Sequence, residues 1–69
     1  MTASDVHSLV RSVIVQLGLP FAILRVIESP AGWNVMLRAG TGGLVHFTVF
    51  GGRPPAMRLA IQAKLEAEL

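Results

Sequence analysis

The sequence predicts an α+β fold of two layers with the order αβββα, in which both helices pack on one face of a three-stranded antiparallel meander. Three observations predict it. An apolar stripe with helical period runs through residues 6–17, three strand-like segments occupy residues 21–50, and a Pro-Pro step at 54–55 opens a second helical segment. We expect residues 1–69 to form a single small domain.

The first helix is predicted over residues 5–17. Its apolar positions recur at i, i+3, i+4, i+7, i+8 and i+11, and they are Val6, Leu9, Val10, Val13, Ile14 and Leu17. Ser4 is a suitable N-cap, and Asp5 suits the positive end of a helix. Gly18 is expected to end the helix in a left-handed conformation, and Pro20 prevents its continuation.

Three strands are predicted over residues 21–28, 33–39 and 44–50. The first is apolar on both faces, and the side chains that we assign to its inner face are Ala22, Leu24 and Val26. The outer face of this strand is assigned Phe21, Ile23, Arg25 and Ile27. The second and third strands alternate cleanly, with Trp33, Val35, Leu37, Val45, Phe47 and Val49 facing inward.

Two turns fix the register of this meander. A four-residue loop over residues 29–32 pairs Leu24 with Leu37, and a three-residue loop over residues 40–42 pairs Leu37 with Val45. The inner faces of all three strands then coincide. Trp33 is expected in the core at one end of the sheet.

The second helix is predicted from Pro55 towards Leu69, because prolines are tolerated in a first helical turn. Its apolar residues spread over a wide arc. Arg58, Gln62 and Glu66, four residues apart, form a narrow polar stripe.

Composition excludes several classes of protein. Hydrophobic residues make up 52% of the chain and charged residues 14%, so the chain is too apolar for a disordered segment. The chain has no cysteine, which excludes a disulfide-stapled miniprotein and fits a cytoplasmic location. No apolar run is long enough for a membrane span.

Catalytic residue types are scarce and scattered. The acids are Asp5, Glu28, Glu66 and Glu68, and the histidines are His7 and His46. No two of them are spaced to face one cleft, and they match no metal-ligand spacing. We therefore expect no catalytic site, no metal and no cofactor.

The outer face of the sheet is the more informative surface. The registers place three rows on it: Ile23–Arg38–Leu44, Arg25–Met36–His46 and Ile27–Asn34–Thr48. Arginine and methionine among aliphatic side chains are typical of a contact patch. The candidate partner-binding residues are Arg25, Met36, Arg38, His46 and Phe50, and the expected partner is a protein, either a second copy or a different chain.

The αβββα order and the segment Gly51-Gly52-Arg53-Pro54-Pro55-Ala56-Met57-Arg58-Leu59-Ala60 resemble the double-stranded RNA-binding domain and its glycine-rich turn into the second helix. The resemblance implies a shared layout. The family places a lysine cluster at the start of that helix, where this chain has Pro54 and Pro55. The family's histidine-bearing loop is shortened here to residues 29–32. The residues that would contact nucleic acid in this alternative are Arg11, Arg53, Arg58 and Lys64.

Two functional hypotheses follow. The first is a non-catalytic binding or structural module that uses the open sheet face, as a homodimer or as a subunit of a larger assembly. The alternative is a nucleic-acid-binding module that lacks the lysine cluster of its layout. Phosphate contacts dominate nucleic-acid affinity, so the missing lysines favour the first hypothesis.

Overall fold

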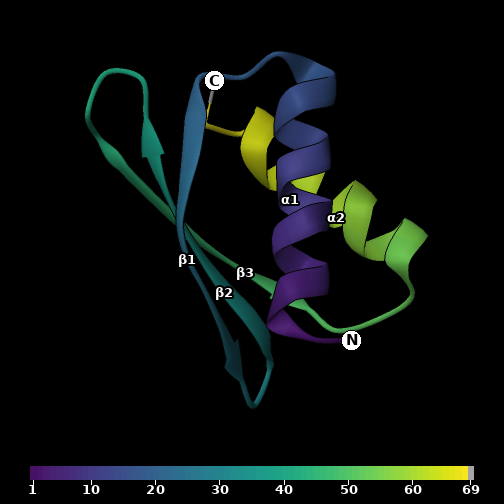
Figure 1. Ribbon diagram of the computed structural model, residues 1–69. Helices are drawn as coiled ribbons and strands as arrows, with labels where there is room; N and C mark the ends of the chain where they lie inside the picture. The colour runs from purple at the N-terminus through teal and green to yellow at the C-terminus, as the bar shows by residue number, and fades with distance from the viewer. Residues whose placement is uncertain (69) are drawn as a thin grey trace.

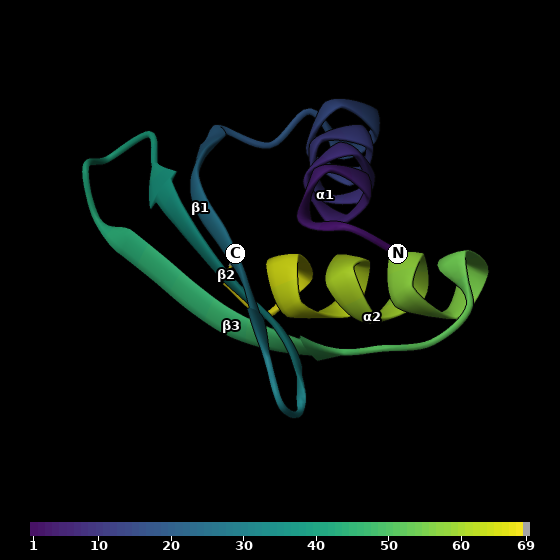
Figure 2. The same ribbon diagram turned by 60° about the horizontal axis from the view of Figure 1, so that its bottom comes forward.

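The computed structural model describes residues 1–68 and confirms the α+β class. The elements follow one another as α1 (Ala3–Leu17), β1 (Phe21–Ser29), β2 (Gly32–Ala39), β3 (Leu44–Phe50) and α2 (Pro54–Glu66). The strands form one antiparallel sheet in the order β1-β2-β3. Both helices lie on the same side of it, where α1 contacts β1, α2 contacts β3, and the helices contact each other (Figures 1 and 2). The predicted end of the second helix at Leu69 lies outside the described residues.

The first helix begins earlier than predicted. Thr2, and not Ser4, is the N-cap, because Thr2 and Asp5 form a capping box. The backbone N–H of Thr2 donates to the Asp5 carboxylate at 2.8 Å, and the backbone N–H of Asp5 donates to the Thr2 hydroxyl at 3.3 Å. At the other end Gly18 adopts the predicted left-handed conformation with φ of 64°.

The core lies between the helices and the inner face of the sheet. The predicted stripe of α1 is confirmed, because Val10 is fully buried and Ile14 is 8% exposed. The predicted inward residues of β2 and β3, Trp33 included, are all buried. From α2 the core receives Met57, Ile61 and Leu65, spaced four residues apart.

The register of β1 matches the prediction over residues 26–28 and differs before the bulge. Ile23, and not Leu24, pairs with Leu37, whereas Arg25 pairs with Met36, so Leu24 is an extra residue in a β-bulge. The bulge reverses the alternation over residues 21–24. Phe21 and Ile23 therefore pack against the core, while Ala22 and Leu24 are exposed.

This bulge has a plain physical reason. Without it, the alternation would place either Phe21 and Ile23 or Val26 on the solvent side. The extra residue lets all three contact the core. The first hairpin also has a two-residue loop in place of the predicted four, since Ser29 pairs with Gly32. The second hairpin has the predicted three-residue loop, closed by the Ala39 N–H donating to the Gly43 carbonyl at 2.8 Å.

Candidate interaction surface

The outer face of the sheet is the surface turned away from both helices. Two of its three predicted rows are confirmed, namely Arg25–Met36–His46 and Ile27–Asn34–Thr48. The third row is wrong, because the bulge puts Ala22 in the place of Ile23, beside Arg38 and Leu44. We use "outer face" for the side chains of Ala22, Arg25, Ile27, Asn34, Met36, Arg38, Leu44, His46, Thr48 and Phe50.

Large apolar side chains on the outer face are solvent-exposed. Phe50 is 71% exposed, Leu44 65% and Ile27 46%, and Met36 lies half-buried at the centre of the middle strand. The bulged Leu24 adds a further exposed side chain beside them. Within residues 1–68 no element covers this side of the sheet (Figure 2).

The charged groups of the outer face have one sign. Arg25 and Arg38 are both exposed, and no acidic residue belongs to the outer face as defined. The hydroxyl of Thr48 donates to the amide oxygen of Asn34 at 2.8 Å, so this donor and this acceptor are paired with each other. The surface therefore offers apolar contact area together with unpaired cationic donors.

Phe50 lies opposite Gly32 at the end of β3. Gly32 has φ of 149°, and a Cβ atom built there would overlap the Val49 carbonyl oxygen and come within 2.8 Å of the Phe50 Cα. Only glycine allows this close approach of β2 to β3. The backbone of Phe50, a predicted contact residue, therefore lies directly against the backbone of Gly32.

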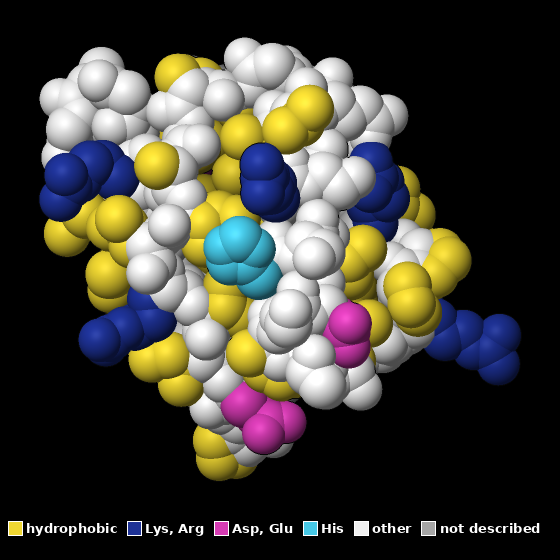
Figure 3. Space-filling model, in the orientation of Figure 1, with side chains coloured by type: hydrophobic (Ala, Val, Ile, Leu, Met, Phe, Trp, Pro, Cys, Tyr) yellow, Lys and Arg dark blue, Asp and Glu magenta, His cyan; other side chains and the backbone are white. Residues whose placement is uncertain are grey.

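The four cations of the nucleic-acid alternative lie on the helices. Arg53 is the N-cap of α2, Lys64 is in its last turn, and these two positions are separated by most of the helix. Arg11 and Arg58 meet at one shallow hollow between α1 and α2. The Lys and Arg side chains visible in Figure 3 lie apart from one another and do not form one patch.

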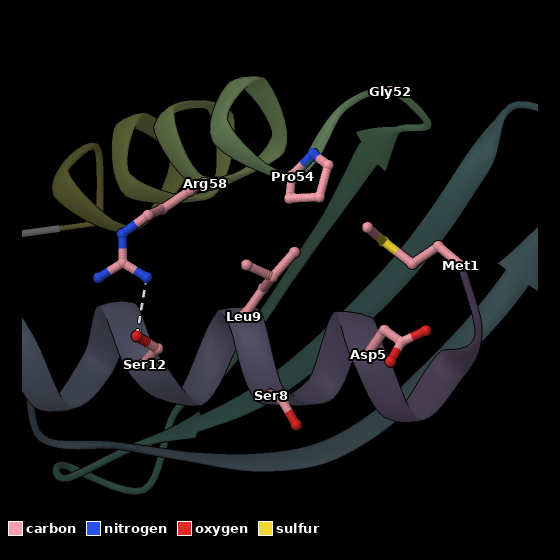
Figure 4. A pocket seen from close by; sticks show the side chains of 8 residues that line it. All are labelled: Met1, Asp5, Ser8, Leu9, Ser12, Gly52, Pro54 and Arg58. Atoms are coloured by element: carbon pink, nitrogen blue, oxygen red, sulfur yellow. Dashed lines mark hydrogen bonds between the residues drawn. The ribbon is translucent and has the colours of Figure 1, made fainter.

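Arg58 is engaged in contacts within the chain. Its guanidinium donates to the Ser12 hydroxyl at 2.7 Å (Figure 4). It also donates to the side-chain oxygen of Gln16, and both acceptors are on α1. Its donors are directed at α1, and this reduces what the side chain could offer to a phosphate.

A second hollow, which sequence reasoning missed, lies at the N-terminal ends of the two helices. It has a volume of about 620 Å³, and its lining includes Met1, Asp5, Ser8, Leu9, Pro54 and Arg58 (Figure 4). The signal in the sequence is the run of polar residues 5, 8 and 12 beside the apolar stripe of α1.

The carboxylate in this hollow is already committed to the capping box. The backbone N–H and then the hydroxyl of Thr2 donate to Asp5 and hold the pKa of its carboxyl below the ordinary value of 3.8. A carboxylate with a lowered pKa is a weak proton acceptor at neutral pH. The hollow therefore has the chemistry of a helix end more than that of an acid–base site.

Comparison of the chain with protein-family models, with curated proteins and with solved structures gives no match. Neither helix in residues 1–68 combines the length and apolar character needed to cross a bilayer. Among the same residues no three His, Asp or Glu side chains gather closely enough to hold a metal ion.

Proposed function

We propose that this chain is a non-catalytic protein-binding module whose contact surface is the outer face of the sheet. The observation that carries the proposal is the exposure of Ile27, Leu44 and Phe50 on a face that also carries two arginines and no acid. Apolar patches of this kind, rimmed by arginine, are typical of protein interaction sites.

The positive charge of the outer face favours a partner that carries carboxylates. Two copies stacked outer face against outer face would bring the Arg25 and Arg38 side chains of one copy towards those of the other. Burying an arginine without a partner is costly, and a like charge adds to that cost. We therefore favour a different protein, with apolar side chains flanked by carboxylates.

An apolar contact of ~400 Å² on each partner would support a moderate affinity. Removing ~400 Å² of apolar area from water contributes ~10 kcal/mol at ~25 cal/mol/Å². The loss of translational and rotational freedom offsets a large part of this gain. Ion pairs to Arg25 and Arg38 would then add specificity and a faster encounter.

The test is selection from a displayed peptide library on the immobilised protein. We expect enriched peptides that combine Asp or Glu with aliphatic or aromatic residues. Met36→Asp, at the centre of the outer face, should weaken binding of these peptides at least ~10-fold, which is ~1.4 kcal/mol. Arg38→Glu, which leaves all apolar positions intact, should weaken them in the same direction.

The matched control is Leu59→Asp, because Leu59 is 68% exposed but lies on α2, away from the outer face. It should leave peptide binding unchanged. The absence of any enrichment, or enriched peptides that bind Met36→Asp and Arg38→Glu as well as they bind the original chain, would contradict the proposal.

Nucleic-acid binding receives less support. Arg58 is held by Ser12 and Gln16, and Pro54 and Pro55 begin the helix at which the resembled family carries lysines. Binding to the phosphate backbone needs several free cations on one surface.

A further inference from the structure

The two edges of the sheet differ in how they are protected against pairing with another strand. The edge strand β1 has a bulge at Leu24 and two charged residues, Arg25 and Glu28, which are common devices against edge pairing. The other edge strand, β3, pairs with β2 over seven consecutive positions without a bulge. Its sequence, LVHFTVF, has no proline, lysine, arginine or acid.

The hydrogen-bonding groups of the free β3 edge can be assigned. The Ala39 N–H donates to the Gly43 carbonyl, so this pair is a hydrogen-bonded pair of the β2–β3 ladder. Hydrogen-bonded and non-bonded pairs alternate in an antiparallel ladder. Val45, Phe47 and Val49 therefore bond to β2. The remaining strand residues point their N–H and C=O groups away from β2, and they are Leu44, His46, Thr48 and Phe50.

The glycines that flank β3 have open space where a side chain would lie. A Cβ atom added at Gly51 or Gly52 would meet no atom within 4 Å, and one added at Gly43 would meet only the Thr41 hydroxyl at 4.0 Å. No packed neighbour therefore fills the side-chain directions of these glycines at either end of β3.

The strand is complementary to itself. Leu44 and Phe50 are equidistant from Phe47, lie on the outer face and are the two most exposed large apolar side chains of the sheet. If two β3 strands pair antiparallel about Phe47, Leu44 of each lies opposite Phe50 of the other, and His46 lies opposite Thr48. These are the residues whose backbone groups point to the free edge, so the ladder forms without breaking a bond to β2.

We propose that two copies of this chain associate through their β3 edges, in antiparallel register about Phe47, to form one continuous six-stranded sheet. The apolar pairs of Leu44 with Phe50 stabilise the junction, and the ladder brings together no formal like charges. This proposal does not rest on the function proposed above. It joins two outer faces side by side, with Leu44 and Phe50 taking part in the junction, and leaves the rest of each outer face accessible.

The proposed dimer also brings the two α2 helices to one side of the sheet. A two-fold axis perpendicular to the sheet keeps both α2 helices on one side of it, and α2 is the helix that contacts β3. The Arg58 side of α2 is turned to α1. The opposite side carries exposed small residues at helical spacing, which are Ala56, Ala60 and Ala63, and the C-cap Ala67 follows them. Small side chains allow two helices to approach closely.

The first test is sedimentation velocity over a concentration series with the original chain and His46→Pro. The His46 N–H points away from β2, so proline removes a donor of the new ladder and spares the existing one. We expect a concentration-dependent dimer for the original chain and a monomer for His46→Pro. If the original chain stays monomeric up to ~1 mM, any dimer has a Kd above ~1 mM. This result would overturn the proposal.

A charge pair tests the register and covers the case in which His46→Pro fails to fold. Leu44→Glu, beside Arg38, and Phe50→Lys, opposite Gly32, should each weaken the dimer at least ~10-fold, because a charge then faces an apolar partner. The double variant Leu44→Glu, Phe50→Lys should recover most of the loss, since opposite charges then meet across the two-fold axis. Loss without recovery would overturn the register.

Met36→Asp serves as the matched control, because it alters the middle strand and should leave self-association unchanged. Loss of peptide binding with the dimer intact separates the outer face from the β3 edge. If Met36→Asp abolishes dimerisation while His46→Pro does not, the copies meet through their outer faces and the edge proposal is wrong.

Discussion

The guanidinium of Arg58 donates a hydrogen bond to the hydroxyl of Ser12 at 2.7 Å, although 46 positions separate the two residues in the chain. Gln16, one turn further along α1, accepts from the same guanidinium. Arg58 thereby ties α2 to α1 outside the apolar core. The polar stripe of α2 is thus not solvated along its whole length.

Arg58→Ala should lower the free energy of unfolding by ~1 kcal/mol, the usual contribution of a partly exposed hydrogen bond. Urea denaturation followed by circular dichroism measures this as a lower midpoint with an unchanged slope. Arg11→Ala, an exposed arginine on α1, is the control and should change stability by less than ~0.5 kcal/mol. Equal effects of the two substitutions would show that the Arg58 contacts add nothing.

Duplex RNA should bind more weakly than ~10 µM at physiological salt, because few free cations share one surface. Fluorescence anisotropy with a labelled duplex measures this affinity. The double variant Pro54→Lys, Pro55→Lys supplies cations where the resembled family has them, and it should bind more tightly, with a steeper dependence on salt. Submicromolar, salt-sensitive binding by the original chain would instead promote nucleic acid to the leading function.

Val10→Ala and Ile14→Ala should each lower the free energy of unfolding by ~1–4 kcal/mol through lost burial and a residual cavity. Both side chains lie in the core cluster between α1 and the sheet. Val15→Ala is a control on the same helix, since Val15 is 71% exposed. Urea denaturation measures these changes. A similar urea midpoint for all three variants would contradict the face of α1 that is assigned to the core.

Much of this fold could be predicted because its patterns are unambiguous. In β2 and β3 one parity is entirely apolar over residues 33–37 and 45–49, whereas the other parity carries Asn34, His46 and Thr48. Only the apolar parity can therefore face the core, and it contains Val35 and Phe47. The stripe of α1 is equally one-sided. The outer-face residues Met36 and His46 follow directly from these parities.

The structure differs from the prediction where the sequence allows two local conformations. Residues 21–27 are apolar on both parities, so alternation cannot reveal that Leu24 is a bulge. Thr2 and Ser4 are both good N-caps, and the choice depends on the carboxylate of Asp5, three residues after Thr2. The Arg58 bonds join residues distant in sequence, and no periodicity reports such a contact.

Gly32→Ala should destabilise the chain by ~1–3 kcal/mol, because its φ is positive and the new Cβ would meet the backbone of Val49 and Phe50. Gly51→Ala is the matched control, since the space around Gly51 is open. It should be neutral or slightly stabilising through the unfolded state. Thermal denaturation of both variants decides between backbone strain and a general sensitivity of glycines in this chain.

The capping box predicts a pH dependence that Asp5→Asn should remove. Hydrogen bonds from Thr2 lower the pKa of the Asp5 carboxyl in the folded chain below its ordinary 3.8. A carboxyl with a lowered folded-state pKa stabilises the fold fully above the pKa of the unfolded state, and this stabilisation is lost as the pH falls through the folded pKa. The original chain should therefore have a higher Tm than Asp5→Asn at pH 7, and the difference should shrink progressively below pH ~4. A difference in Tm that stays constant from pH 7 to pH 2 would mean that Asp5 acts through packing or backbone propensity, and the charge of the carboxylate would then have no part in holding the start of α1.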